Sequence, residues 1–225
     1  MLLAGGQSRR MFAEGPGHGD KGLLEIGGKP MLAHVIDRLA PQVGPIVINV
    51  NGDPARFEGF GLPFVADTIA GHVGPLAGVL AGMRWAVSHH AGARYIATVS
   101  TDAPFVPKDL VARLAAARDA GPGGGGAQIA LARSGGHLHP VIGLWPVALA
   151  DDLQASLQDG VRKVLAWTDR HGTVGVDFAP VRVGGEDVDP FFNANTPDEL
   201  AEARRLLEQC IVLDERPTVQ PKQEG

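Results

Sequence analysis

A glycine-rich turn followed by positive charge stands at the start of the chain. A short apolar run leads directly into the segment Leu3-Ala4-Gly5-Gly6-Gln7-Ser8-Arg9-Arg10-Met11. Asp20 and Lys21 follow further along the chain. Backbone N–H groups of a glycine turn can approach phosphate oxygens closely, and the two arginines and the lysine add fixed positive charge. The combination predicts a site that binds a nucleoside triphosphate and stabilises charge on departing pyrophosphate.

Other phosphate loops fit this segment less well. A Walker A loop requires G-x-x-x-x-G-K-[ST], whereas Lys21 lies between Asp20 and Gly22. The dinucleotide fingerprint G-x-G-x-x-G is missing from this turn. A generic strand-to-helix turn with solvated arginines remains the alternative interpretation.

A single carboxylate marks the end of the most apolar strand candidate. Asp102 follows the run Tyr95-Ile96-Ala97-Thr98-Val99, and open α/β sheets bind ligands at the carboxyl ends of such strands. Mg²⁺ prefers hard oxygen ligands and typically takes one or two carboxylates together with phosphate oxygens and water. A carboxylate at the position of Asp102 therefore suits Mg²⁺, and a turn aspartate before Pro104 is the alternative.

Further polar side chains and a glycine stand where strands end or helices begin. Asn49 and Asp67 each close a predicted strand, where they could contact a ligand or form turns. Asn193 and Asn195 alternate along an extended segment, so both side chains should point to one side, although a capping or turn role is nearly as well supported. Gly78 lies at a helix start that favours anions, or it simply permits close helix–sheet packing.

The elements that must position these residues alternate between strands and helices. Short β-rich runs predict strands at Ile46–Val50, Pro63–Ala66, Tyr95–Ser100, Gln128–Ala132, Val141–Trp145 and Val174–Phe178. Amphipathic runs predict helices at Pro30–Leu39, Leu76–Ser88, Pro107–Arg118, Val147–Leu157, Val161–His171 and Pro197–Gln209. This alternation indicates an α/β fold with a mainly parallel sheet covered by helices on both faces.

Composition limits both the organisation and the class of protein. The 225 residues suffice for one well-buried domain, expected at 1–209, and the polar stretch 210–225 is expected to be a disordered tail. A net charge of −5 argues against a nucleic-acid partner, and no apolar run is long enough to predict a membrane span. Cys210 is the only cysteine, so an intrachain disulfide is ruled out. The start Met1-Leu2-Leu3 resembles no leader, so a cytoplasmic location is expected.

Other reactive side chains support weaker hypotheses. His137 and His139 could offer two imidazoles to a transition metal, but a third ligand at a recognisable spacing is missing. Ser8 and Ser100 lack the G-x-S-x-G elbow of serine hydrolases. We therefore expect neither a transition-metal site nor a nucleophilic serine.

An ordered set of motifs resembles one enzyme family. Leu-Ala-Gly-Gly-x-Ser-x-Arg-Met followed by Asp-Lys is similar to the signature of the molybdenum cofactor guanylyltransferases, the MobA family of the nucleotidyltransferase superfamily. The resemblance spans roughly residues 1–209 and continues in order through Ile48-Asn49, Asp67, Gly74-Pro75-Leu76-Ala77-Gly78, Ser100-Thr101-Asp102-Ala103-Pro104 and Asn193-Ala194-Asn195-Thr196-Pro197-Asp198-Glu199-Leu200. It implies a single Rossmann-like three-layer domain with a mixed, mainly parallel sheet, like that of nucleotide-diphospho-sugar transferases.

The resemblance also implies a reaction and a set of site residues. GMP would pass from GTP to molybdenum-molybdopterin with Mg²⁺ as cofactor, and molybdoenzymes or their chaperones would be further partners. Catalysis would fall to Arg10, Lys21 and Asp102, with Asp102 as the metal ligand. The nucleotide would contact Leu3, Ala4, Gly5, Gly6, Lys21, Asn49, Asp67 and Asp102. Gly78, Asn193 and Asn195 would lie on the pterin or metal side.

Three rival functions remain open at this point. CMP transfer to the same cofactor and nucleotidyl transfer to a sugar phosphate are the nearest. Gly5-Gly6 favours guanylyl transfer, because cytidylyl relatives typically carry alanine before the glycine. A non-catalytic module that delivers the cofactor belongs to another class, and the presence of Lys21 and Asp102 argues against it.

Overall fold

The computed structural model describes residues 1–4, 11, 20–69, 74–120 and 128–214, with side chains described as far as residue 209. Its main sheet is built from β1 (Leu2–Leu3), β4 (Ile48–Asn49), β5 (Phe64–Val65), β6 (Tyr95–Ser100), β7 (Ile129–Ser134), β8 (His137–Pro146) and β9 (Thr173–Asp177). Two small hairpins are β2–β3 (Glu25–Ile26, Lys29–Pro30) and β10–β11 (Val181–Val183, Glu186–Val188). The α-helices are α1 (Met31–Leu39), α2 (Pro75–His89), α3 (Leu110–Asp119), α4 (Ala150–Gln158), α5 (Val164–Thr168) and α6 (Pro197–Asp214).

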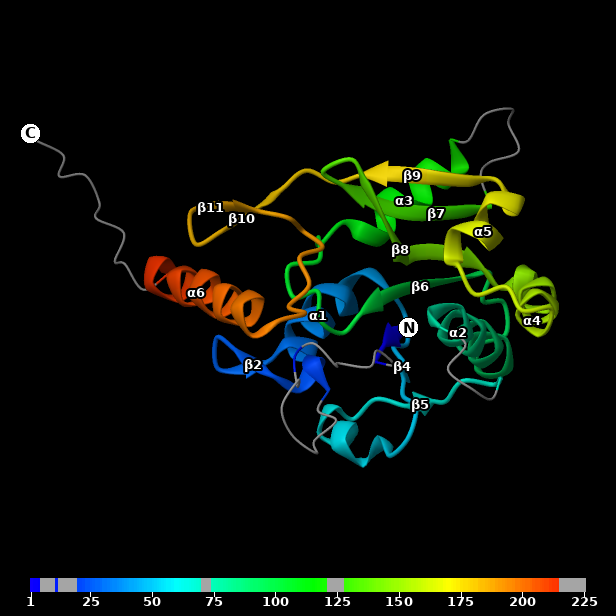
Figure 1. Ribbon diagram of the computed structural model, residues 1–225, viewed down its shortest axis with the longest axis horizontal. Helices are drawn as coiled ribbons and strands as arrows, with labels where there is room; N and C mark the ends of the chain where they lie inside the picture. The colour runs from blue at the N-terminus through cyan, green and yellow to red at the C-terminus, as the bar shows by residue number, and fades with distance from the viewer. Residues whose placement is uncertain (5–10, 12–19, 70–73, 121–127, 215–225) are drawn as a thin grey trace, which may run out of the picture.

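The strand order of the main sheet is β5-β4-β1-β6-β8-β7-β9 (Figure 1). The first four strands in this order are mutually parallel, β8 runs antiparallel to both β6 and β7, and β9 is parallel to β7. This mixed, mostly parallel α/β sheet confirms the predicted fold class. The carboxyl ends of β5, β4, β1 and β6 therefore meet at one edge, and the β7–β8 turn lies at that same edge.

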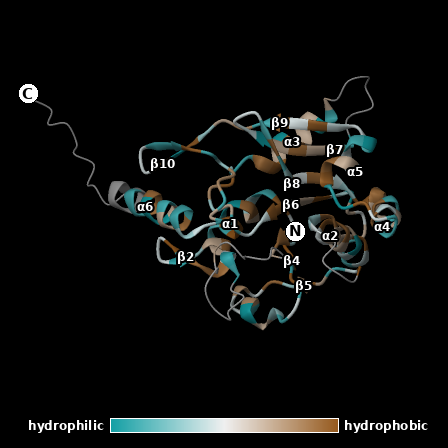
Figure 2. Cartoon of the chain, viewed as in Figure 1, coloured by the Kyte–Doolittle hydropathy of each residue, from teal (hydrophilic) through white to brown (hydrophobic). Residues whose placement is uncertain are grey.

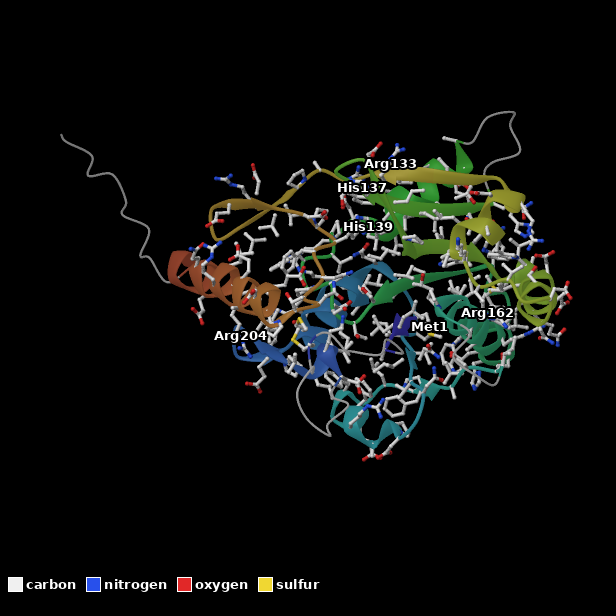
Figure 3. All side chains as sticks on the ribbon, in the orientation of Figure 1. Met1, Arg133, His137, His139, Arg162 and Arg204 are labelled. Carbon is white, nitrogen blue, oxygen red and sulfur yellow. The ribbon has the colours of Figure 1, made fainter. Side chains whose placement is uncertain are left out.

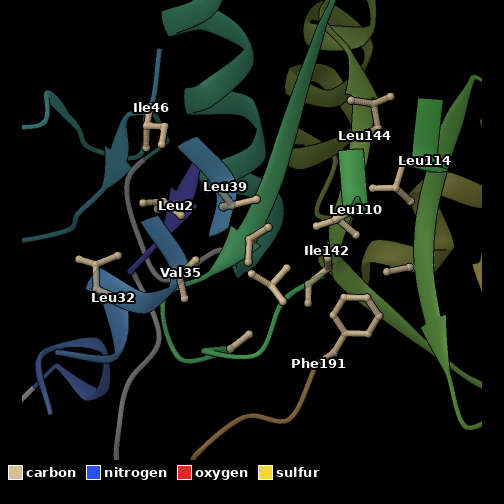
Figure 4. Packing of buried hydrophobic residues seen from close by; sticks show 14 of the residues in the cluster. Leu2, Leu32, Val35, Leu39, Ile46, Leu110, Leu114, Ile142, Leu144 and Phe191 are labelled. Carbon is tan, nitrogen blue, oxygen red and sulfur yellow. The ribbon is translucent and has the colours of Figure 1, made fainter. Parts of the chain in front are cut away.

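Helices cover the two faces of the sheet because side chains alternate along each strand. In β7, Ala130 and Ala132 pack with α1 and α3, whereas Ile129 and Leu131 pack with α2, α4 and α5. Figure 4 shows the first of these cores, in which Leu39 and Leu110 approach the sheet. Figure 2 shows hydrophobic residues concentrated along the central strands and hydrophilic residues along much of α6.

A third, smaller core joins distant parts of the chain. The helix α6 packs against β2 and β10, and Ile26, Phe105, Val183 and Leu206 are buried together there. In Figure 1 this unit lies at the left, on the opposite side of the molecule from α4 and α5. Across the described ranges, helices long and apolar enough to cross a membrane are not found.

Each predicted strand and helix is present, most of them with shifted ends. The strand predicted at Tyr95–Ser100 matches β6 residue for residue. The strand β7 begins one residue later and ends two residues later than predicted, and β8 extends beyond its prediction at both ends. The predicted helix from Val161 begins only at Val164, because Gly160 has a φ of 89° and Val161 N–H donates back to Ser156 O. The last helix continues past the predicted Gln209 to Asp214.

Three hairpin turns found in the described parts of the chain were not predicted, although their signal is in the sequence. Each is a Gly-Gly pair: Gly27-Gly28 between β2 and β3, Gly135-Gly136 between β7 and β8, and Gly184-Gly185 between β10 and β11. All six glycines have positive φ values, between 53° and 88°. Two-residue hairpins of this kind require positive φ at both positions, which glycine adopts at no steric cost.

A bulge in β8 is held by one buried hydroxyl. Leu131 of β7 pairs with Gly143, but the next residue pairs with His139, so residues 140–142 of β8 bulge out of register. Thr98 on β6 donates its hydroxyl to Val141 O at 2.7 Å and accepts from Trp145 Nε1 at 2.7 Å. Thr98 and Trp145 are fully buried. A bulge changes the direction in which neighbouring side chains point, and here the hydroxyl of Thr98 fixes the backbone geometry of the bulge.

Thr98→Val should destabilise the fold by about 3 kcal/mol, because two buried polar groups lose their partner at roughly 1–3 kcal/mol each. The free energy of unfolding in urea measures this loss. Thr98→Ser keeps the hydroxyl and removes only a methyl group, so its cost should be about 1 kcal/mol. Equal stability of the valine variant and the native chain would contradict the bridging role.

Candidate active site

The candidate site lies at the edge where the parallel strands end. Leu3 pairs with Asn49 on one side and with Ser100 on the other, and Asn49 pairs with Val65. The four strand ends are thus level with each other. Asp67 and Asp102 each follow two residues after such an end, so both carboxylates lie at the same edge of the sheet.

One half of the site is an ion pair extended by an amide. Lys21 Nζ donates to Asp102 Oδ2 at 2.9 Å and to Asn195 Oδ1 at 2.5 Å. The side chains of Lys21 and Asp102 are only 15% and 13% exposed. Three segments that are distant in the sequence therefore meet at one ammonium group. Three predicted site residues are thus in direct contact, while their roles stay predictions.

The close approach of Lys21 depends on the next residue. Lys21 begins the short 3₁₀ helix Lys21–Leu23, and a Cβ built on Gly22 would lie 2.8 Å from both Cβ and Oγ1 of Thr101. Only glycine lets this turn pack against the residue that precedes Asp102. Gly22 was not predicted as a site residue, although its position directly after Lys21 was a usable signal.

A second ion pair precedes this turn. Arg56, in the 3₁₀ helix Pro54–Phe60, donates from Nε to Asp20 Oδ2. Burial raises the pKa of the Asp20 carboxyl, and the guanidinium of Arg56 opposes that shift. Arg56 also donates to the backbone oxygens of Asn51 and Asp53, so it ties the start of the Lys21 turn to the loop after β4. Arg56 was not predicted from the sequence.

The other half of the site is a cluster of amides around a second carboxylate. Asn49 is 3% exposed, and its Nδ2 donates to Asp67 Oδ1 at 2.9 Å and to Val65 O at 3.2 Å. Asn51 Nδ2 donates to Asp67 Oδ2 at 2.7 Å, while Asn51 Oδ1 accepts from Asp67 N at 3.1 Å. Asn49 and Asp67, predicted separately, are thus direct partners. Asn51 was missed, although it alternates with Asn49 along the chain.

Gly78 lies beside this amide cluster, at the start of α2. A Cβ built on it would lie 2.5 Å from Asn49 Oδ1 and 2.8 Å from Leu3 Cδ2. Close packing of this helix against the sheet at Gly78 is thus present, while a role of Gly78 on the ligand side stays a prediction. Gly78 lies next to Asn49 and Leu3, two residues predicted to bind the nucleotide, whereas the resemblance implies that Gly78 lies on the pterin or metal side.

Gly78→Ala should weaken GTP binding and destabilise the fold by about 1–3 kcal/mol, because the methyl group must displace Asn49 or Leu3 in a packed core. Urea unfolding and GTP titration measure the two effects. Gly44→Ala is the matched control, since a Cβ there meets nothing within 4 Å. If Gly78→Ala unfolds at the same urea concentration as Gly44→Ala, the packing role of Gly78 is wrong.

Asn193 and Asn195 precede α6, whose first turn is capped by other groups. Thr196 Oγ1 accepts from Glu199 N–H at 3.2 Å, and Glu199 Oε2 accepts from the N–H groups of both Asn195 and Thr196. This is a capping box. The Asn195 side chain is free of capping and contacts Lys21 instead, and its Nδ2 donates to Asn193 O at 3.2 Å. Among the described residues, Asn193 Oδ1 is buried without a hydrogen-bond partner.

Part of the predicted site lies outside the described residues. This holds for Gly5, Gly6 and Arg10, so the phosphate loop remains a prediction. The residue that leads into this loop, Ala4, is described. Its N–H donates to Asn49 O at 3.0 Å, which fixes the end of β1 next to the amide cluster.

The described donor set suits Mg²⁺ better than a transition metal. Groups of three or more His, Cys, Asp or Glu side chains that could hold a metal are not found in the described ranges. Asp102 supplies one hard carboxylate beside a lysine, and Mg²⁺ commonly takes one or two carboxylates and completes its shell with phosphate oxygens and water. Asp102 therefore fits a Mg²⁺ ion that arrives with a triphosphate.

A mixed α/β sheet with a Lys–Asp pair at the ends of its parallel strands has the arrangement of an α/β enzyme that binds its ligand at this edge of the sheet. Solved structures with this fold include molybdopterin-guanine dinucleotide biosynthesis protein A from Archaeoglobus fulgidus, with a TM-score of 0.65 and 22% identity over 92% of this chain and 97% of that one. Another is 4-diphosphocytidyl-2C-methyl-D-erythritol synthase from Anaerococcus prevotii, with a TM-score of 0.63 and 10% identity over 92% and 94%.

The chain belongs to the MobA-like NTP transferase family, whose domain model matches residues 1–174. Among similar proteins, the molybdenum cofactor guanylyltransferase of Bradyrhizobium sp. (strain ORS 278) is 51% identical over 207 residues, 92% of this chain and 91% of the relative. The molybdenum cofactor guanylyltransferase of Mesorhizobium japonicum is 46% identical over 209 residues, 92% and 95% of the two chains. The predicted family and enzyme class are confirmed.

Proposed function

We propose that this chain transfers GMP from GTP to molybdenum-molybdopterin, forming the molybdopterin guanine dinucleotide cofactor and releasing pyrophosphate. The observation that carries the proposal is the Lys21–Asp102–Asn195 contact at the ends of the parallel strands, in a chain about half identical to molybdenum cofactor guanylyltransferases. The product would then pass to molybdoenzymes or their chaperones.

The reaction is a displacement at phosphorus. A terminal phosphate oxygen of the molybdopterin attacks the α-phosphorus of GTP in line, one P–O bond forms, and the bond to the β-phosphate breaks. A protein base is not required, because a phosphate nucleophile is already ionised at neutral pH. Catalysis then rests on positioning and on neutralising charge.

The residues divide this work between them. Lys21, together with Arg10, binds phosphate oxygens, and the backbone of Gly5 and Gly6 cradles them. Asp102 would hold Mg²⁺, which would supply charge neutralisation at the phosphates. The ion pair of Lys21 with Asp102 keeps both groups in place before substrate arrives.

Binding of each substrate would use a different half of the site. Asn49 and Asp67, with Leu3 and Ala4 beside them, lie on the side of β1, β4 and β5 and are proposed to bind the guanine nucleotide. Asn195 contacts Lys21, and together with Asn193 it is proposed to face the pterin or the metal. The unpaired oxygen of Asn193 supports this assignment, since a buried acceptor without a partner favours binding a donor.

Pyrophosphate release in the presence of Mg²⁺ and molybdenum-loaded molybdopterin tests the proposal, with GTP and CTP in parallel reactions. Release with GTP alone, stopped by removal of Mg²⁺ with a chelator, is the expected result. Release with CTP alone would keep the chemistry but reverse the choice of base. Failure of both nucleotides in a folded chain that still binds GTP would refute guanylyl transfer and favour the cofactor-delivery function.

A further inference from the structure

A buried hydrogen-bonded cluster of histidine, serine and aspartate lies beside the site, and its function is not accounted for by the phosphate chemistry. Ser134 ends β7 and is 4% exposed. Its Oγ lies 2.6 Å from His139 Nε2 on β8 and 2.8 and 2.9 Å from the two carboxylate oxygens of Asp189. Figure 3 shows Arg133, His137 and His139 in succession from the rim of the molecule toward its centre.

The order of donors in this cluster differs from that of a hydrolase triad. The serine has one hydroxyl proton, and the carboxylate can only accept, so Ser134 donates to Asp189. Ser134 Oγ then accepts from His139, which must carry its proton on Nε2. In a nucleophilic triad the histidine lies between serine and aspartate and accepts the serine proton. Here the serine lies in the middle, so it is not activated as a nucleophile.

The state of His139 agrees with this assignment. Burial lowers the pKa of the His139 imidazole, as does His137, while the Asp189 carboxylate raises it. A neutral imidazole with its proton on Nε2 donates one hydrogen bond, which Ser134 Oγ receives. The β8 bulge held by Thr98 is what brings His139 opposite Ala132, diagonally across from Ser134.

The third member of the cluster begins the segment that reaches Lys21. Asp189 Oδ1 also accepts from Phe191 N–H at 2.8 Å, and Asp189 O accepts from Phe192 N–H at 3.0 Å. The Phe191 ring, 2% exposed, packs 4.7 Å from the His139 ring and 5.3 Å from the Phe178 ring. The chain then continues through Asn193 to Asn195, whose side chain accepts from Lys21.

We infer that His139, Ser134 and Asp189 form a positioning network that holds the segment 189–195 against the β7–β8 hairpin and thereby sets where Asn195 meets Lys21. His139 is proposed as a positioning residue, since within the described ranges it contacts Ser134 and Phe191 and reaches Lys21 only through the segment 189–195. This inferred network adds a positioning role to the proposed guanylyl transfer, and its expected effect on kinetics rests on that proposed function. The network should affect turnover more than GTP binding, because the amide cluster at Asn49 lies on the other half of the site.

A pair of substitutions at one position separates hydrogen bonding from packing. His139→Gln places an amide N–H donor where the imidazole donates to Ser134, whereas His139→Leu fills similar space without a donor. Ser134→Ala removes Oγ, the atom that links His139 to Asp189. Thermal unfolding confirms that each variant is folded before comparison.

The first readout is amide hydrogen exchange, which needs no substrate. Exchange in peptides covering 189–196 should be about three- to tenfold faster in His139→Leu and in Ser134→Ala, and close to native in His139→Gln. Peptides from α4 serve as the internal reference. Native exchange in the leucine variant, or equally fast exchange in the glutamine variant, would overturn the inference.

The second readout is steady-state kinetics with GTP and the loaded pterin. His139→Leu should lower kcat about tenfold with the KM for GTP within about twofold, and His139→Gln should recover most of the loss. A leucine variant with native kcat, or one that loses only GTP affinity, would overturn the kinetic part. An inactive native chain would refute the proposed function instead, and the exchange experiment would still decide on the network.

Discussion

Asp102→Asn should lower kcat for guanylyl transfer by about 10³-fold, because it removes the carboxylate proposed to hold Mg²⁺ where charge develops on the phosphates. The amide keeps the size of the side chain and can still accept from Lys21, so the fold and the Lys21 turn should survive. The KM for GTP should change by only about threefold, since Lys21 is then freed from its ion pair and remains available to phosphate. Pyrophosphate release over a range of GTP and Mg²⁺ concentrations measures both constants.

The matched control for this variant is Asp187→Asn. Asp187 also pairs with a basic residue, Arg182, but both of these side chains are about two-thirds exposed and lie in the β10–β11 hairpin. Exposed pairs of this kind contribute little, so native activity is expected. Turnover of Asp102→Asn within about tenfold of the native rate would remove Asp102 from the catalytic centre.

Lys21→Met should raise the KM for GTP by about 10- to 100-fold, the effect of losing one charge-assisted hydrogen bond to phosphate. A fall in kcat should accompany it, because the same ammonium group stabilises charge on departing pyrophosphate. The methionine preserves most of the apolar stem, but Asp102 is left without its 2.9 Å partner. Some loss of stability at neutral pH is therefore also expected, and isothermal titration with GTP separates binding from turnover.

Lys29→Met provides the comparison for the lysine. Lys29 pairs with Asp37, and its side chain is 41% exposed on the β2–β3 hairpin, away from the strand ends. Its loss should leave both KM and kcat close to native. If the two lysine variants bind GTP with the same affinity, the assignment of Lys21 to the triphosphate is wrong.

The fold could be predicted because its pattern is local. The run before Asp102 alternates between the two helix-covered faces, and its predicted bounds match β6 residue for residue. The start of α6 was also evident, because the capping box of Thr196 and Glu199 depends on residues three positions apart. Strand alternation and capping boxes depend only on residues a few positions apart, so both can be recognised in a short window of sequence.

The pairing of the site residues could not be predicted in the same way. Lys21 and Asn195 were named separately, but their contact spans 174 positions and depends on how α6 packs against β2. The cluster of Ser134, His139 and Asp189 was missed because it requires the β8 bulge, whose cause is a hydroxyl on a different strand. From the sequence, His139 was interpreted only as a candidate metal ligand, whereas in the structure it donates to Ser134.

The contact between Lys21 and Asn195 joins a residue made early in synthesis to one made after the whole main sheet. The last strand of that sheet, β9, ends at Asp177, so every strand of the sheet and Asp102 leave the ribosome before Asn195 does. A chain that stops before Asn195 would keep the residues of every strand of the main sheet but would lack the amide partner of Lys21.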